Sequence, residues 1–527
     1  MGGNARLAVL VFIAAFATQT NCQKAILHVF NGSTAQDFCI VYNHSWTRLP
    51  QSLDDAEVYS LVNLTSTLLC DQSGVRPEEV KDKALVVMRG DCPFSQKAQV
   101  AQSLGASVLL IASLQTLVTP SADNYSGVHI PIALMRYRDF VEAQQVFDEG
   151  MRVRLYAPLL SKIDPSLFVM LLISIVAVSL AGYWNRACER DALRSSGGSG
   201  SGSEVNKADS GELSLSSPLK VGIYVALMCV MLILMFYFYK YLVYILIAMF
   251  CCASAAALFR CLNAVLEKLS CPAGSFTIRN TDLSVRCLIL AAVCISVSVV
   301  WGVYRNEERW VWILQDILGF AFCINFIKTI SLSNFKICVI LLSLLLVYDV
   351  FFVFITPFFT KSGVSIMEQV ALGPEASGEK ALSQTKANMV AIPADPQPPT
   401  EELPVVMRIP RFSAWALNLC EMQFVILGYG DIIVPGLLVA YCSKFDVWIN
   451  SKIYFFSSCL AYLLGMITTF AVMVLSNTGQ PALLYLVPFT IIMSAAVAGY
   501  RGEMKHFWTG TSYEVLDSSR EPLLTGA

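Results

Sequence analysis

From residue 166 onward, the chain alternates between long apolar runs and shorter polar segments. A helix needs about 20 mostly apolar residues to cross the hydrocarbon core of a bilayer, and these runs approach or reach that length. The pattern therefore predicts a polytopic α-helical membrane protein. Nine runs qualify as transmembrane helices, at 166–184, 221–239, 241–259, 287–304, 310–327, 337–355, 422–441, 453–475 and 481–500.

Residues 1–22 have a different pattern. Arg6 precedes an apolar run of only about half the length of a span, which small polar residues follow. This arrangement is typical of a cleaved signal peptide, so we expect the segment 23–160 to enter the secretory lumen. N-glycosylation sites of the form Asn-x-Ser/Thr occur in that segment and nowhere else in the chain, at Asn31, Asn43, Asn63 and Asn124.

Within the lumenal segment, short apolar runs predict a strand–helix–strand unit at 84–88, 94–104 and 106–112. The segment resembles a protease-associated domain, whose pattern is matched by residues 87–94, 97–106 and 130–134. We find no catalytic constellation in it and interpret it as a binding or spacing module. Its cysteines predict one disulfide whose pairing stays open among Cys39, Cys70, Cys92 and Cys22, which lies at the cleavage boundary.

The distribution of basic residues predicts the orientation of the spans. With 23–160 in the lumen, the segments after the odd-numbered spans are cytosolic, and these carry most of the Lys and Arg residues of the short loops. The Gly/Ser-rich segment 185–219 is then a flexible cytosolic linker. Helices two to nine occupy 221–500, with a lumenal loop at 361–411 and a cytosolic tail at 501–527.

The composition supports this class and excludes others. The chain is 55% hydrophobic and only 14% charged, and its net charge of −2 does not favour binding to nucleic acid. None of the four histidines lies in an apolar run, which excludes a histidine-based metal site or a Ser-His-Asp triad within the bilayer. We therefore expect no metal and no other cofactor.

Two carboxylates stand out because a charged group at bilayer depth costs roughly 2.5–3.5 kcal/mol on insertion scales. Asp349 lies in the sixth apolar run and Asp431 in the seventh. With the helical rise of about 1.5 Å per residue, both fall near the middle of the bilayer, and consecutive antiparallel spans usually pack side by side. Two carboxylates that share a site cannot both ionise easily, which leaves one acid and one base, as in aspartic proteases.

Two short motifs accompany these acids. Gly428, Tyr429 and Gly430 precede Asp431, and the missing side chains of the glycines allow a substrate backbone to approach. The ninth run opens with Pro481, Ala482 and Leu483, and Tyr348 precedes Asp349. In the chain order Tyr348-Asp349, Gly428-Tyr-Gly-Asp431 and Pro481-Ala-Leu483, the three elements resemble the intramembrane aspartyl proteases of the presenilin and signal peptide peptidase superfamily. The resemblance covers essentially the whole chain and narrows to the signal peptide peptidase-like branch with a lumenal protease-associated domain, whose long signatures are similar to residues 305–319, 348–357 and 431–441.

The resemblance implies a presenilin-like catalytic core in which Asp349 and Asp431 are catalytic and Pro481-Ala482-Leu483 shapes the substrate site. It implies hydrolysis within the membrane span of type II single-pass proteins, often after ectodomain shedding, with release of a cytosolic fragment. It also implies that residues 403–409 offer a strand edge to the unwound substrate. Tyr429 departs from the family pattern, because a smaller or non-hydroxylated apolar residue is usual there, and we expect an effect on substrate preference.

The polar residues in the apolar runs also allow other interpretations. Paired acids also serve as proton relays, so a proton-coupled transporter or leak channel is the alternative function, although we find no internal repeat. A receptor without catalytic activity would not need two costly acids. Asp316 is interpreted as a structural hydrogen-bonding group rather than a third functional acid, and Gln315 and Asn325 are interpreted as polar contacts between helices.

The tail contains Tyr513-Glu-Val-Leu516, which has the Tyr-x-x-apolar form read by clathrin adaptors. It predicts a late endosomal or lysosomal membrane protein, with the Golgi and the plasma membrane as alternatives. The expected partners are the lipid bilayer, type II single-pass substrates and clathrin adaptors. A monomer and a homo-oligomer both stay open.

Overall fold

The structure is a computed structural model that describes residues 23–44, 46–72, 74–90, 92–114, 117, 120, 127–147, 150–158, 164–196, 213–215, 218–269, 275–278, 281–307, 309–360, 365–367, 370, 403–412, 424–476 and 480–510. The predicted signal peptide, Asn124 and the Tyr513-x-x-Leu516 motif lie outside these residues. The chain divides into two compact units, one built mainly on residues up to Ser161 and one that begins at Lys162.

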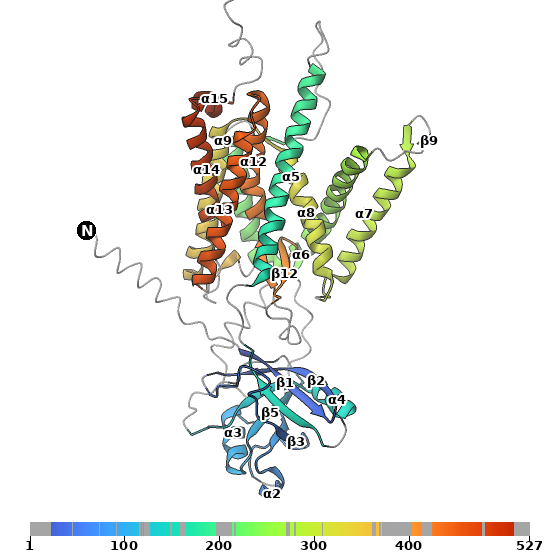
Figure 1. The fold of residues 1–527 in the computed structure, drawn as a ribbon, viewed down its shortest axis with the longest axis vertical. Helices are drawn as coiled ribbons and strands as arrows, with labels where there is room; N and C mark the ends of the chain where they lie inside the picture. Colours follow the sequence, from blue (N-terminus) through green and yellow to red (C-terminus); the bar gives the residue numbers. More distant parts are fainter. Residues whose placement is uncertain are drawn as a thin grey trace, which may run out of the picture. The chain divides into compact units, whose positions relative to one another are not determined.

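The first unit is a closed seven-stranded β-barrel in the order β1-β2-β6-β5-β4-β3-β7 (Figure 1). β4 and β5 are parallel neighbours joined by α3, which is the strand–helix–strand unit that the sequence predicts. Both strands are buried almost throughout, as their continuous apolar runs require. The elements are β1 (Gln23–Asn31), β2 (Thr34–Tyr42), β3 (Tyr59–Leu64), α2 (Pro77–Val80), β4 (Ala84–Met88), α3 (Phe94–Ser103), β5 (Val108–Ser113), β6 (Ile132–Arg136), α4 (Tyr137–Phe147) and β7 (Arg152–Tyr156).

The cysteines of this unit are more extensively paired than the sequence suggests. Cys70 is bonded to Cys92, which ties the segment after β3 to the segment before α3. Cys39 is also disulfide-bonded, so the unit holds more than the one disulfide that we expected. Of the predicted glycosylation sites, Asn31 and Asn63 are exposed and Asn43 is half-buried.

The second unit is a bundle of long helices with α12 at its centre (Figure 1). α12 packs against α5, α8, α9, α13 and α14, and nearly all of its residues are buried. The helices are α5 (Pro165–Ser196), α6 (Pro218–Lys268), α7 (Val285–Tyr304), α8 (Val311–Thr329), α9 (Phe335–Val350), α12 (Tyr429–Trp448), α13 (Ile453–Ser476), α14 (Leu483–Tyr500) and α15 (Met504–Thr509). α9 continues through a π-helical turn, η1 (Phe351–Ile355), and a 3-10 turn, η2 (Thr356–Phe358).

Three two-stranded sheets accompany the helices. A parallel pair joins β8 (Leu213–Leu215) to β11 (Ile330–Leu332), and an antiparallel pair joins β9 (Ser275–Ile278) to β10 (Thr281–Ser284). The third pair is antiparallel and joins β12 (Val406–Pro410) to β13 (Phe424–Gly428), directly before α12. This last sheet carries the chain into the helix that holds Asp431.

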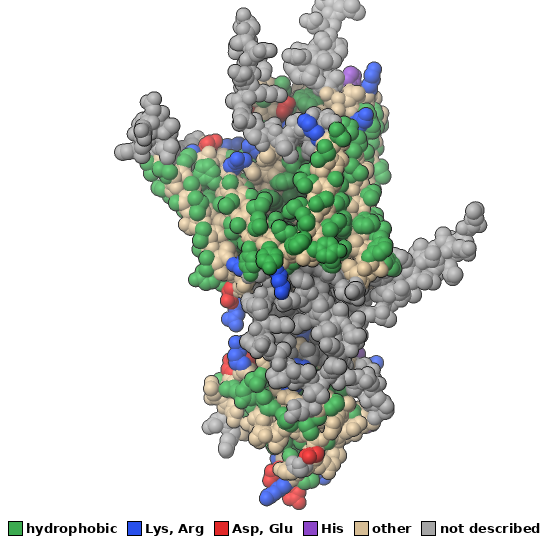
Figure 2. All heavy atoms as spheres, turned by 180° about the vertical axis from the view of Figure 1, so that it is seen from behind, with side chains coloured by type: hydrophobic (Ala, Val, Ile, Leu, Met, Phe, Trp, Pro, Cys, Tyr) green, Lys and Arg blue, Asp and Glu red, His purple; other side chains and the backbone are tan. Residues whose placement is uncertain are grey.

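Within the described residues, seven helices are long and apolar enough to cross a membrane. The backbone of α6, one of the seven, breaks at Phe238, and each half has the length of a span. α12 has 20 residues but carries three charged side chains, which keeps it out of the seven. Counting the halves of α6 separately and adding α12 agrees with the nine predicted spans. Figure 2 shows hydrophobic side chains covering the visible face of this unit, as expected of a surface in contact with lipid.

Several predicted boundaries differ from the structure. The helix predicted to begin at 422 begins at Tyr429, because residues Phe424–Gly428 form β13 instead. α5 continues to Ser196, so the first part of the predicted flexible linker is helical. The loop predicted at 361–411 contains β12, which overlaps the stretch 403–409 that was expected to offer a strand edge. Hydropathy located the apolar runs but did not distinguish a buried strand from a helix, or the polar end of a helix from a loop.

Candidate active site

Asp349 is the penultimate residue of α9 and is only 4% exposed. Its carboxylate accepts a hydrogen bond from the backbone N–H of Leu483. Among the described residues, its Oδ2 atom has no hydrogen-bond partner. The preceding Tyr348 packs its ring against Phe352, at 4.8 Å between ring centroids, in the π-helical turn that follows. Asp349 therefore keeps one carboxylate oxygen available at a buried position.

Asp431 lies in the first turn of α12. Its carboxylate accepts a hydrogen bond from the backbone N–H of Gly428, the residue at the N-cap of the helix. A negative charge in the first turn interacts favourably with the helix dipole. Asp431 also interacts electrostatically with Asp349, so the structure brings together the two acids that the sequence singles out.

The two glycines before Asp431 have different surroundings. A Cβ atom at Gly428 would lie 3.3 Å from Oδ2 of Asp431, so a larger residue would crowd the carboxylate. A Cβ atom at Gly430 would meet nothing within 4 Å. Gly428 thus gives the carboxylate room, and Gly430 borders open space.

The Pro-Ala-Leu motif leads into α14, with Ala482 at the N-cap and Leu483 as the first helical residue. Pro481, Ala482 and Leu483 are all buried, and the carbonyl oxygen of Ala482 accepts the N–H groups of Tyr485 and Leu486, each at 3.1 Å. The first N–H groups of a helix have no partner within the helix. One of them, that of Leu483, binds Asp349. The motif therefore contacts the candidate dyad through its backbone.

Tyr429 points away from the acids and toward α8. It is 5% exposed, and its ring stacks on Phe250 at 6.2 Å between centroids, with Phe322 beside it at 6.3 Å. Its hydroxyl donates to the backbone oxygen of Gln315 at 3.4 Å. A Cβ atom at Gly319 would overlap the phenol, so the glycine provides the space for the ring.

The polar residues of α8 bind the β12–β13 sheet. Asp316 accepts the backbone N–H of Arg408 at 2.9 Å, which confirms that it is a structural hydrogen-bonding group. The side chain of Gln315 donates to the backbone oxygen of Val406 at 2.8 Å, so the prediction that it bonds another helix was wrong. Oδ1 of Asn325 is buried, and no hydrogen-bond partner for it occurs in the described part of the chain. Sequence reasoning missed the role of Gly319, although it lies in the signature 305–319.

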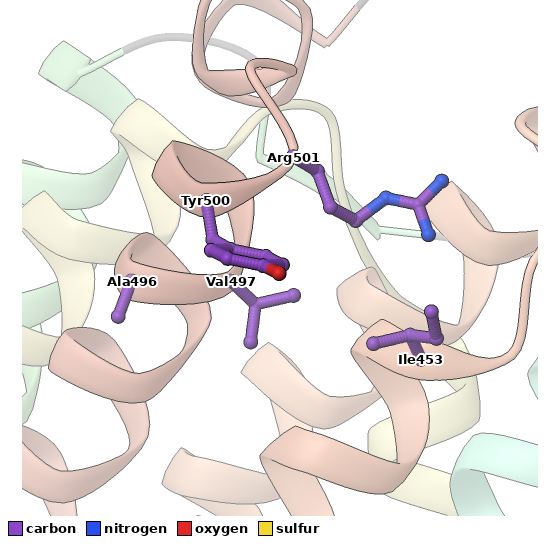
Figure 3. Close-up of a pocket in the computed structure, with 5 residues that line it drawn as sticks. All are labelled: Ile453, Ala496, Val497, Tyr500 and Arg501. Carbon is purple, nitrogen blue, oxygen red and sulfur yellow. The ribbon is translucent and has the colours of Figure 1, made fainter.

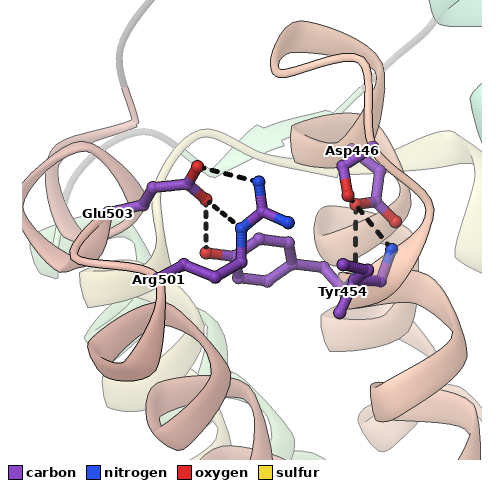
Figure 4. Close-up of polar contacts among 6 residues, drawn as sticks. Asp446, Tyr454, Arg501 and Glu503 are labelled. Carbon is purple, nitrogen blue, oxygen red and sulfur yellow. Dashed lines mark hydrogen bonds and ion pairs between the residues drawn. The ribbon is translucent and has the colours of Figure 1, made fainter.

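A further buried acid, Asp446, lies at the end of α12 opposite to Asp431. It was assigned no role from the sequence. It accepts the backbone N–H groups of Tyr454 at 3.2 Å and Phe455 at 2.8 Å, so it caps the start of α13 (Figure 4). The Tyr454 hydroxyl donates to Glu503, which is also paired with Arg501 at 3.0 Å. All these groups are satisfied, and the cluster therefore acts as a structural tie.

A pocket of about 350 Å³ lies at the adjoining ends of α13 and α14 (Figure 3). Its lining is apolar except for Arg501, which is already paired with Glu503, and it includes Tyr500 and Ile453. It contains neither acid of the dyad. Among the described residues, no three His, Cys, Asp or Glu side chains cluster as a metal site would require. These features add no chemistry to the candidate dyad.

Comparison with known proteins identifies the family. The signal peptide peptidase family model matches residues 209–514, and the protease-associated (PA) domain model matches residues 57–142. The chain is 45% identical to human signal peptide peptidase-like 2A over 96% of this chain and 95% of that protein. It is 44% identical to the mouse 2A protein (94% and 91%) and 39% identical to human signal peptide peptidase-like 2B (95% and 83%).

The solved structures that match include aminopeptidases that cover only part of the chain. A zinc aminopeptidase from Bacillus subtilis covers 29% of this chain and 37% of its own, with 19% identity and a TM-score of 0.20, which is too low to carry an argument. The match to the family model over residues 209–514 and the identity to relatives over nearly the whole chain are sufficient to assign the family. The chain belongs to the signal peptide peptidase family and is an intramembrane protease.

Proposed function

We propose that the protein is an aspartyl endopeptidase that cleaves type II single-pass membrane proteins within their transmembrane segments. The observation that carries the proposal is the pairing of Asp349 and Asp431 inside a bundle of membrane-length helices. Each carboxylate is held by one backbone N–H group, from Leu483 and from Gly428. Two interacting carboxylates at this depth provide the acid and the base that peptide hydrolysis requires.

The reaction follows from one protonated and one ionised carboxyl group. The ionised group takes a proton from water, and the resulting hydroxide equivalent attacks the carbonyl carbon of the substrate. The protonated group donates a hydrogen bond, and then its proton, to the carbonyl oxygen. In the tetrahedral intermediate the C–N bond breaks and the amine leaves with the proton that the first carboxylate took from water. The other carboxylate takes a proton from one hydroxyl of the intermediate as the carboxyl product forms. The dyad returns to one acid and one base.

The substrate must be extended before hydrolysis, because the carbonyl groups of a helix are shielded by their own hydrogen bonds. Strand addition to a sheet edge is the usual way to hold an extended peptide. The β12–β13 sheet ends at Gly428, whose N–H binds Asp431. A peptide added to this sheet would have its backbone carried toward the dyad. This arrangement supports an endopeptidase.

The substrate class rests on the predicted orientation of the spans. With α9 leaving the cytosol and α12 returning to it, the two spans that carry the acids run opposite to those of the presenilins. This orientation favours type II substrates, whose cleavage releases a cytosolic fragment. We also place the protein in the late endosomal or lysosomal membrane, on the basis of Tyr513 and Leu516. Ectodomain shedding would supply the substrates as short stubs, and clathrin adaptors would read the tail.

The deciding experiment replaces each acid by its isosteric amide. Asp349→Asn and Asp431→Asn, assayed with a type II stub in proteoliposomes, are each expected to reduce cleavage to background. Asp191→Asn, which changes an exposed carboxylate on α5, is the matched control and is expected to retain activity. Cleavage that survives either amide substitution would refute the dyad. Proton flux that is lost in both variants while cleavage continues would favour the transporter.

A pH profile provides an independent test. Because one carboxyl must be protonated and the other ionised, cleavage is expected to fall on both sides of a mildly acidic optimum. Vesicles that are clamped at the same pH on both sides and assayed in steps give the profile. A flat rate between about pH 5 and 8 would contradict a shared proton.

A further inference from the structure

The two edges of the β12–β13 sheet differ in their hydrogen bonding. The N–H of Tyr429 donates to the oxygen of Val405 at 3.0 Å, which fixes the alternation along the antiparallel pair. Val405, Met407 and Ile409 therefore direct their backbone groups toward β13, and the residues between them direct theirs away from it. Val406 and Arg408 form the outer edge of β12.

That outer edge is occupied by α8. Gln315 donates to the oxygen of Val406 at 2.8 Å, and Asp316 accepts the N–H of Arg408 at 2.9 Å. Two consecutive helix residues thus bind two strand residues that face the same side. A shift of β12 by one residue would turn both backbone groups away from α8 and break both bonds. The pair therefore fixes the register of the strand.

The outer edge of β13 is different. Phe424 and Ile426 direct their backbone N–H and C=O groups away from β12, according to the same alternation. No hydrogen bond to these outward groups occurs within the described residues. The side chain of Ile426 is also 45% exposed. This edge continues to Gly428 and Asp431, whereas the edge of β12 faces α8.

We propose that Gln315 and Asp316 are positioning residues that close the edge of β12 and hold the sheet in register, so that substrate is admitted only along the edge of β13. This inference rests on the proposed protease function. It replaces the expectation from the sequence that residues 403–409 present the strand edge. Tyr429 adds a third attachment, because its ring packs on α8 and its N–H binds Val405.

The test measures where and how fast the full-length protein cuts. Gln315→Leu and Asp316→Leu remove the groups that bind β12, and each is expected to lower kcat/KM at least tenfold. Because the sheet is no longer fixed in register, cleavage is also expected to spread to neighbouring peptide bonds, which mass spectrometry of the products detects. Asp316→Asn retains an oxygen that accepts the Arg408 N–H and is expected to restore both rate and site. Asn325→Leu is the matched control on the same helix.

A second pair of variants covers the case in which the leucine variants do not fold. Gln315→Asn and Asp316→Glu keep the polar groups but move them by one methylene, and they are expected to shift the cleavage site while the chain stays folded. Wild-type rate and a single unchanged site in folded Gln315→Leu and Asp316→Leu proteins, or in the second pair, would overturn the inference. So would an Asp316→Asn variant that is as impaired as Asp316→Leu. Absence of cleavage by the wild-type protein would instead refute the proposed function.

Discussion

Replacing Gly319 by alanine would place a methyl group against Tyr429 at the point where α8 and α12 approach each other. A Cβ atom at this position would lie 2.6 Å from Cε1 of the phenol ring and closer still to its hydroxyl end. Carbon atoms in ordinary contact are about 3.5–4.0 Å apart, so the ring or the helix must move by about 1 Å. The ring cannot move freely, because Phe250 stacks on one of its faces and Phe322 lies beside it.

The magnitude follows from the cost of overpacking a buried site, which is typically about 1–3 kcal/mol. Tyr429 is the first residue of α12, and Asp431 lies two residues later in the same helical turn. A displacement of the Tyr429 ring is therefore transmitted to the Asp431 carboxylate. If the whole cost appears in the activation barrier, kcat/KM falls by about 5- to 150-fold. We expect a loss of at least about fivefold for Gly319→Ala.

The assay is cleavage of a type II membrane stub by the purified full-length protein in proteoliposomes. Gly222→Ala is the matched control, because a Cβ atom at that helical glycine meets nothing within 4 Å and should leave kcat/KM unchanged. Tyr429→Leu removes the colliding ring. In that background, Gly319→Ala is expected to change kcat/KM by less than about threefold, which gives a large coupling between the two sites. Full activity of Gly319→Ala, or an equal loss with and without Tyr429, would refute the reasoning.

Three further predictions concern other parts of the chain. Ile426→Pro removes an outward N–H from the edge of β13 and leaves the hydrogen bonds to β12 intact. We expect cleavage to be lost while the thermal midpoint is retained, and normal cleavage would exclude this edge as the substrate site. Phe507→Ala empties a fully buried site between Phe335 and Tyr454, at a cost of about 3–5 kcal/mol. The thermal midpoint in detergent should therefore fall by several degrees, and an unchanged midpoint would contradict this packing. Cys92→Ser opens the disulfide to Cys70 and should cost the β-barrel unit about 2–4 kcal/mol, seen as faster proteolysis of that unit alone in the intact protein. Equal rates would show that the disulfide does not stabilise it.

The amino-acid sequence was sufficient for the features that depend on local composition. Apolar runs must be helical to satisfy their backbone groups in lipid, so the spans could be located from hydropathy. Asp349 and Asp431 could be singled out as candidates from the same runs, because a carboxylate in an apolar span is costly without a function. The strand–helix–strand unit of the β-barrel also followed from local patterns, and β4, α3 and β5 confirm it.

Contacts between residues distant in the sequence could not be predicted in this way. The bond from Gln315 to Val406 joins residues 91 positions apart, and nothing in either segment specifies the other. Hydropathy also placed residues 424–428 in a helix, because a buried strand and a buried helix have the same apolar composition. The direction of Tyr429 depends on the space left by Gly319 on another helix. The packing of α8, α9, α12 and α14 alone decided which edge of the sheet is open and which backbone N–H group binds each acid. Hydrogen bonds of this kind form only after the helices have come together.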